Sequence, residues 1–205
     1  MRQGVLGREC EVEAGAAFLN RLGPGPVALV YAGEPGIGKT TLWTEAVEQA
    51  RAQSFVVLAA RPVQAEDRLA FAALSDLLEP VADDLLPALP VPQQRAIAVA
   101  LLREDPDDRR LDQHAIGAGT ATIVKALART APVVVAVDDL QWLDPSSARV
   151  LEFALRRLEG LPVAIIAAQR TGDPSGFRSI SSVRSHTGAS HASRLGRWAW
   201  PSCTA

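Results

Sequence analysis

Hydrophobic residues follow two patterns along the chain, and the two patterns alternate. Short runs that are almost entirely apolar occupy 27–31, 55–59, 133–137 and 162–168. Between them lie longer segments in which apolar residues recur every three or four positions. The short runs are typical of strands buried on both faces, and the spacing of three or four is typical of helices with one buried face. The alternation predicts an α/β fold with a mostly parallel sheet of about four recognisable strands.

The helical spacing predicts helices within 1–22 and over 41–53, 69–79, 114–130 and 146–158. Glycines and prolines at 23–26 end the first of these. Four prolines, at 80, 87, 90 and 92, are expected to break up the segment after residue 79. Gly117 and Gly119 are expected to weaken the start of the helix over 114–130.

The pattern stops at the end of the last predicted strand. All 23 acidic residues lie at or before Asp173, and the rest of the chain is rich in serine and arginine. We therefore expect a domain over 1–173 and an irregular, disordered or loosely packed tail over 174–205. The fold would then lack a further strand, leave an apolar sheet edge exposed and tend to self-associate. A basic tail that binds nucleic acid or an acidic surface is the alternative.

Bulk composition limits the classes of protein to which the chain can belong. With 205 residues, 48% of them apolar, and a mean hydropathy of +0.09, the chain fits one globular domain. The sequence has neither a long apolar run nor a signal-peptide core, so we expect a cytoplasmic protein without a membrane span. The acidic excess before residue 174 disfavours a nucleic-acid surface, and two distant cysteines support neither a disulfide nor a zinc site.

A glycine-rich stretch lies directly between the first predicted strand and the helix over 41–53. It reads Gly33-Glu34-Pro35-Gly36-Ile37-Gly38-Lys39-Thr40, followed by Thr41. This order is the P-loop arrangement, in which backbone N–H groups and a helix N-terminus surround phosphates. It predicts a P-loop NTPase sandwich of three layers, and all nine residues are predicted to bind the nucleotide.

Two side chains of this stretch carry specific chemistry. Lys39 is predicted to reach the β- and γ-phosphates of ATP as a catalytic cation, and the Thr40 hydroxyl is predicted to ligate Mg²⁺. The chain has 19 arginines but only two lysines, Lys39 and Lys125. Lysine is therefore kept where a compact ammonium group suits a phosphate.

A second informative stretch is the apolar run over 133–137, which ends in Asp138 and Asp139. At the carboxyl end of a central strand, Asp138 would hold Mg²⁺ and Asp139 would act as the general base that polarises water. The alternative is an Asp-rich turn after a buried strand. Asp144, followed by Pro145, is expected to cap the next helix in either case.

Two arginines remain open to more than one interpretation. Arg8 precedes the first helix and would either belong to a simple turn and cap or lie against an adenine ring. Arg170 follows the last predicted strand, so it would either sense the γ-phosphate at the same sheet edge or be a surface residue.

Four motifs together resemble one family. They are the residues at 6–9, the P-loop, the string Asp-Asp-Leu-Gln-Trp-Leu-Asp-Pro at 138–145, and the strand ending at Arg170. The chain resembles the STAND ATPases, relatives of the AAA superfamily, and in particular the ATPase module of large ATP-binding LuxR-type transcriptional regulators. The resemblance covers residues 4 to about 173. It implies an ATP-dependent switch followed by a helical sensor region and a helix-turn-helix, which this sequence lacks.

Three hypotheses follow for function. The first is a regulatory module that binds ATP with Mg²⁺ and hydrolyses it slowly through Asp139 to ADP and phosphate. The second is a free-standing P-loop phosphotransferase, for which the charged segment over 103–110 is the one available lid. The third is an inactive, truncated remnant.

Overall fold

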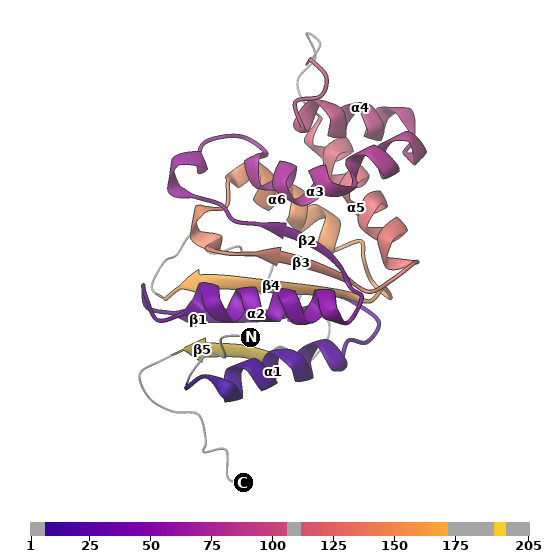
Figure 1. The fold of residues 1–205 in the computed structure, drawn as a ribbon. Coiled ribbons are helices and arrows are strands. Elements are labelled where there is room, and N and C mark those ends of the chain that lie inside the picture. Colours follow the sequence, from indigo (N-terminus) through magenta and orange to yellow (C-terminus); the bar gives the residue numbers. More distant parts are fainter. Residues whose placement is uncertain (1–6, 106–111, 172–190, 196–205) are drawn as a thin grey trace.

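The computed structural model describes residues 7–105, 112–171 and 191–195. Five parallel strands form one sheet in the order β2-β3-β4-β1-β5 (Figure 1). Their bounds are Val27–Gly33 (β1), Val56–Ala60 (β2), Val133–Val137 (β3), Val163–Arg170 (β4) and His191–Leu195 (β5). The predicted α/β fold with a parallel sheet is confirmed.

Helices cover both faces of the sheet and make it the middle of three layers (Figure 1). Helices α1 (Glu9–Asn20) and α2 (Lys39–Ala52) pack on one face. Helices α3 (Ala72–Leu85), α5 (Gln113–Ala128) and α6 (Pro145–Leu155) pack on the other, and α4 (Val91–Ala100) lies against α5. Short 3₁₀ turns are η1 (Gln64–Glu66), η2 (Leu86–Ala88) and η3 (Leu140–Trp142).

Uniform burial explains why the central strands could be predicted. All five residues of β3 are buried, because the strand lies between β2 and β4 and beneath helices on both sides. Its alternate residues therefore enter two cores: Val135 contributes to the core below α3 to α6, and Val134 to the core below α1 and α2. A strand in this position needs apolar residues throughout.

The region after β2 differs most from the prediction. Helix α3 runs to Leu85 with Pro80 inside it, and the additional helix α4 follows where prolines were expected to prevent regular structure. Pro92 lies in the first turn of α4. The N–H that proline lacks has no partner within the helix at this position, so Pro92 is compatible with the start of a helix.

The glycines of α5 have a packing role. A Cβ at Gly117 would lie 2.6 Å from Cδ1 of Phe153, and one at Gly119 would lie 2.8 Å from Cγ1 of Ile97. Helix α5 therefore approaches α6 and α4 too closely for a side chain at these positions. The two glycines lack a Cβ, and this permits the close approach.

Strand β5 corrects the expectation for the sheet edge. The sequence predicted an exposed edge with no partner, but β5 pairs with β1 over five residues, from Leu29 opposite His191 to Gly33 opposite Leu195. The pairing joins backbone groups, so it does not need an apolar sequence. The remainder of the predicted tail, 174–190 and 196–205, lies outside the described residues.

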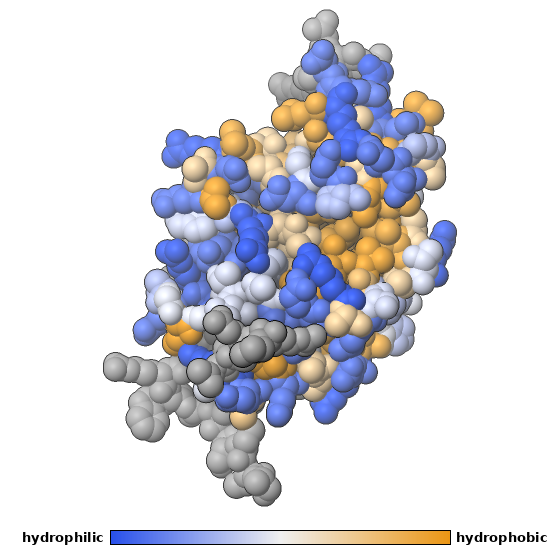
Figure 2. All heavy atoms as spheres, viewed as in Figure 1, coloured by the Kyte–Doolittle hydropathy of each residue, from blue (hydrophilic) through white to orange (hydrophobic). Residues whose placement is uncertain are grey.

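Hydrophilic side chains cover much of the surface in the view of Figure 2. The large apolar side chains that are exposed in the described part of the chain are Val63, Leu69, Val91 and Leu102. Among the helices of the described residues, none is long and apolar enough to cross a membrane.

Candidate nucleotide-binding site

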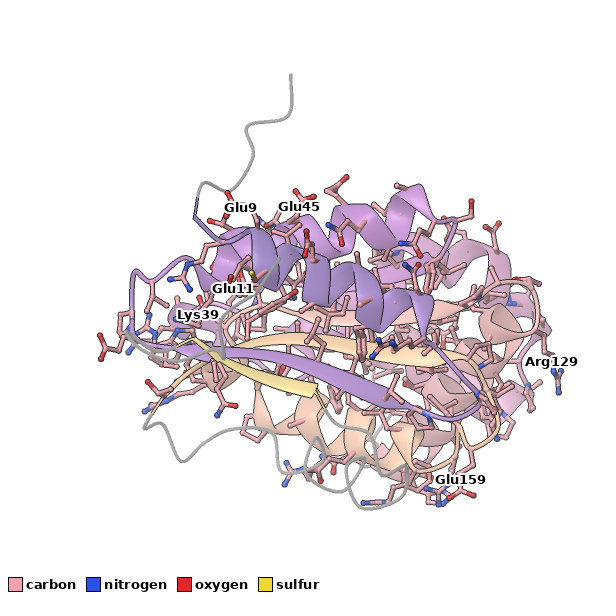
Figure 3. The ribbon with its side chains drawn as sticks, turned by 90° about the horizontal axis from the view of Figure 1, so that it is seen from below. Glu9, Glu11, Lys39, Glu45, Arg129 and Glu159 are labelled. Atoms are coloured by element: carbon pink, nitrogen blue, oxygen red, sulfur yellow. The ribbon has the colours of Figure 1, made fainter. Side chains whose placement is uncertain are left out.

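The predicted functional residues meet at the carboxyl edge of the sheet. Gly33 at the end of β1 pairs with Arg170 at the end of β4, and β3 ends beside β4. Figure 3 shows Lys39 at this end of the sheet, with Arg129 and Glu159 at the opposite end. Parallel strand order therefore brings together segments separated by more than a hundred residues.

The loop after β1 has the conformation that phosphate binding requires. Gly36 and Gly38 have φ values of 78° and 96°, which favour glycine. Gly38 is the N-cap of α2, and no side chain caps this helix end. The first N–H groups of α2 have no partner within the helix and so can bind an anion. Gly33 is the last residue of β1, and its φ is not positive.

Lys39 is held across the loop. Its side chain is largely buried, with 6% of the residue exposed, and Nζ donates to the carbonyl oxygen of Glu34 at 2.9 Å. The ammonium group thus lies over the loop that would surround the phosphates. Glu34 contributes its backbone carbonyl oxygen to this hydrogen bond.

Thr40 and Asp138 form an oxygen-rich corner beside Lys39. Thr40 Oγ1 donates to Asp138 Oδ1 at 3.4 Å, and Asp138 is only 4% exposed. Burial raises the pKa of Asp138, the Thr40 hydrogen bond opposes this, and the Asp139 charge adds to it. A hydroxyl and a buried carboxylate are hard oxygen ligands, so this pair fits Mg²⁺.

Asp139 is fixed through its backbone and through its side chain. Its φ of 48° lies in the left-handed region, and its N–H donates to Asp138 Oδ1 at 3.0 Å. Its carboxylate Oδ1 accepts a hydrogen bond of 2.7 Å from Nε2 of Gln141. The left-handed turn directs the chain away from β3 immediately after Asp138.

A cavity of about 250 Å³ lies between these groups. It is lined by Pro35, Gly36, Gly38, Lys39, Thr40, Asp139 and Arg170. The guanidinium of Arg170 lies over the Trp142 ring, 5.6 Å from its centre. The structure therefore brings the P-loop, Asp139 and Arg170 together, as a γ-phosphate site would require.

Other predicted residues lie outside the cavity lining. Arg8 donates to Glu11 at 2.9 Å and to the carbonyl oxygen of Ile37 at 3.2 Å, so it ties α1 to the loop. Ile37 and Thr41, like Gly33 and Glu34, do not line the cavity. The proposed contact of Arg8 with adenine stays a prediction.

The possible lid of a phosphotransferase is described only in part. Arg103 donates to the carboxylates of Asp83 and Glu79 in α3, at 2.5 and 2.6 Å. Residues 106–110 lie outside the described part of the chain. Arg103 is thus held against a helix and away from the cavity lining.

Two residues at the site were missed in the sequence analysis. Gln141 bridges Asp139 and the backbone of Arg170, and it belongs to the motif over 138–145. Arg61 follows β2 and stacks 4.9 Å from the centre of the Trp43 ring, and its charge opposes in part the rise in the pKa of Asp138 that burial causes. The rule that selected Arg170, a position just past a parallel strand, also selects Arg61.

Asp144 connects the site to the helical layer behind it. Its carboxylate caps α6 through Ser147 N at 2.8 Å, which confirms the predicted capping role. It also accepts from Phe71 N at 3.0 Å and from Ala73 N at 3.3 Å, at the start of α3. With 1% of the residue exposed, Asp144 joins the loop after β3 to two helices.

Comparisons with known proteins bear on the fold and on the family of the chain. None of the curated proteins matches the sequence. Among solved structures, Cdc6p from Pyrobaculum aerophilum is similar, with a TM-score of 0.53, 17% identity, and coverage of 94% of this chain and 46% of that one. The ORC2 protein of Aeropyrum pernix gives a TM-score of 0.50 and 20% identity, covering 93% and 48%. At such identities the likeness concerns the fold, and the chain spans about half the length of these proteins.

The family assignment rests on the sequence itself. The profile of the AAA ATPase domain matches residues 4–166, which include the P-loop and the strand that precedes Asp138. This range covers most of the chain and contains every described element from α1 to β3, α6 and the first part of β4. The chain therefore belongs to the AAA ATPase domain family.

Proposed function

We propose that this chain is an ATP-binding regulatory module in which slow ATP hydrolysis resets a switch. The observation that carries the proposal is one cavity lined by Lys39, Thr40, Asp139 and Arg170, with Asp138 behind Thr40. A cation, an uncapped helix N-terminus and two carboxylates at one edge are what a Mg²⁺-nucleoside triphosphate needs.

Each residue has a separate task in this proposal. Lys39 and the N–H groups of the loop bind the β- and γ-phosphates, while Thr40 and Asp138 hold Mg²⁺, which would neutralise phosphate charge. Asp139 orients a water molecule and accepts its proton, and Arg170 contacts the γ-phosphate. Arg8, which donates to the carbonyl oxygen of Ile37, would lie against the adenine ring.

Support for the nucleotide also comes from a similar structure. The Aeropyrum pernix ORC2 protein was solved as ADPNP and ADP complexes. From this structure we infer only the type of ligand for this chain, a nucleotide. The regulatory role rests on the motifs at 6–9 and 138–145, which resemble the ATPase module of LuxR-type STAND regulators. In this proposal the chain acts in the cytoplasm and is able to self-associate.

Calorimetric titration tests the proposal directly. ATP and ADP are titrated into the chain with and without Mg²⁺, and phosphate release is followed separately. We expect ATP to bind more tightly with Mg²⁺ and to be hydrolysed slowly. If neither nucleotide binds and Mg²⁺-ATP leaves the melting temperature unchanged, the inactive remnant is the better description. Transfer of labelled phosphate to a small acceptor would instead indicate a phosphotransferase.

A further inference from the structure

Gln141 occupies a buried position between two strands of the site. It belongs to η3, directly after the acid pair, and only 7% of the residue is exposed. It does not line the cavity that Asp139 and Arg170 line. Its side chain therefore reaches the site through these two neighbours and would not contact a nucleotide in that cavity.

Both ends of the Gln141 amide have a complementary partner. Nε2 donates to Asp139 Oδ1 at 2.7 Å, and Oε1 accepts from the backbone N–H of Arg170 at 3.2 Å. The opposite amide orientation would place an oxygen against a carboxylate and an NH₂ group against an N–H. The two partners thus fix the orientation of the amide.

The contacts of Asp139 show why this bridge matters. The backbone N–H of Asp139 is held by Asp138, so the main chain of the acid is already fixed. The orientation of its carboxylate depends on the donor from Gln141, which binds one of the two oxygens. A carboxylate held in this way needs less reorganisation when it accepts a proton.

We propose that Gln141 is a positioning residue for ATP hydrolysis, which orients the carboxylate of Asp139 and joins it to the end of β4 at Arg170. This inference rests on the proposed function of Asp139 as the base. The Gln141 amide thereby keeps Asp139, which would activate water, at a constant position relative to Arg170, which would contact the γ-phosphate.

The chemistry of the side chain limits which residues could replace it. Glutamate has the same shape and can still accept from Arg170 N, but its charge would repel the Asp139 carboxylate. Methionine has a similar volume and forms neither hydrogen bond at comparable strength. Gln141→Glu therefore replaces the donor by a negative charge and keeps the contact with Arg170 N, and Gln141→Met removes both contacts with little change in volume.

The experiment measures ATP binding and turnover separately in these two variants. Gln53→Glu, at the exposed end of α2, is the control for adding a charge. Calorimetry with Mg²⁺-ATP gives Kd, and single-turnover phosphate release gives the rate of hydrolysis. We expect both Gln141 variants to keep Kd within about threefold and to lose roughly 10- to 100-fold in rate, as expected for a lost hydrogen bond to a charged group.

Other results would overturn the inference. Hydrolysis at the wild-type rate in either folded variant, or an equal loss of binding and rate, would show that Gln141 has only a structural role. If the wild-type chain binds ATP without hydrolysing it, the proposed catalytic function fails and this inference fails with it. If wild type hydrolyses ATP and Gln141→Met does so equally well, only the inference fails.

Discussion

The Thr40 hydroxyl lies 3.4 Å from the Asp138 carboxylate, although 98 positions separate the two residues in the sequence. Thr40 lies in the first turn of α2 and Asp138 directly follows β3, and β4 lies between β3 and the strand that leads to the P-loop. The contact therefore depends on the strand order of the whole sheet. It explains why two motifs found separately in the sequence can serve one metal and one nucleotide.

Replacing Lys39 by alanine should abolish nucleotide binding. The substitution removes the ammonium group that lies over the loop and leaves the phosphate charge without its main cation. We expect ATP affinity to fall at least roughly 100-fold in calorimetric titration. Lys125→Ala removes the one other lysine, in the last turn of α5, and should bind ATP like wild type. Micromolar affinity in Lys39→Ala would contradict the assignment of the P-loop.

Asp139→Asn should separate binding from hydrolysis. Asparagine keeps the size and polarity of the side chain but cannot accept the proton of water, so Kd should stay within a few-fold while hydrolysis falls by roughly 10²-fold. Asp138→Asn is the matched comparison, because it should weaken the dependence of binding on Mg²⁺. An equal loss of binding and hydrolysis in Asp139→Asn would place Asp139 on the metal instead.

Most of the site could be predicted because its parts are local motifs. The P-loop and the acid pair each follow an apolar strand, and parallel strands bring such segments to one edge. Arg61 directly follows β2, and the rule that selected Arg170 would have found it. Gln141 was missed because its role depends on the backbone of Arg170 in β4. In the same way, strand β5 has no apolar run in its sequence and exists through pairing with β1.

Asp144→Ala should destabilise the protein more than the loss of one helix cap. The carboxylate is buried and accepts from N–H groups of both α6 and α3, which alanine would leave unpaired. We expect a loss of about 3 kcal/mol and a Tm lower by about 6–12 °C. Asp112→Ala removes an exposed cap of α5 alone and should cost about 1 kcal/mol. Equal losses would show that the contact with α3 contributes nothing.

Gly117→Ala should destabilise the protein although alanine favours a helix. The new Cβ would lie 2.6 Å from Cδ1 and 3.0 Å from Cγ of Phe153, so α5 and α6 must move apart. Overpacking of this kind costs about 1–3 kcal/mol, against a gain of up to about 1 kcal/mol from helix propensity. Gly23→Ala has no atom within 4 Å of the new Cβ and is the control. A higher Tm in Gly117→Ala would show that this close packing adapts at little cost.

Removing β5 should lower stability and promote association. A chain ending at residue 190 loses the strand that pairs with β1, which would expose the backbone groups and apolar residues of that edge. A chain ending at residue 195 keeps the strand and is the matched control. We expect the shorter chain to melt at a lower temperature and to form larger species in light scattering, while the control behaves like the full chain. Equal melting temperatures for the two chains would show that residues 191–195 add nothing to the sheet, and the domain would then end near residue 173, as its sequence pattern suggests.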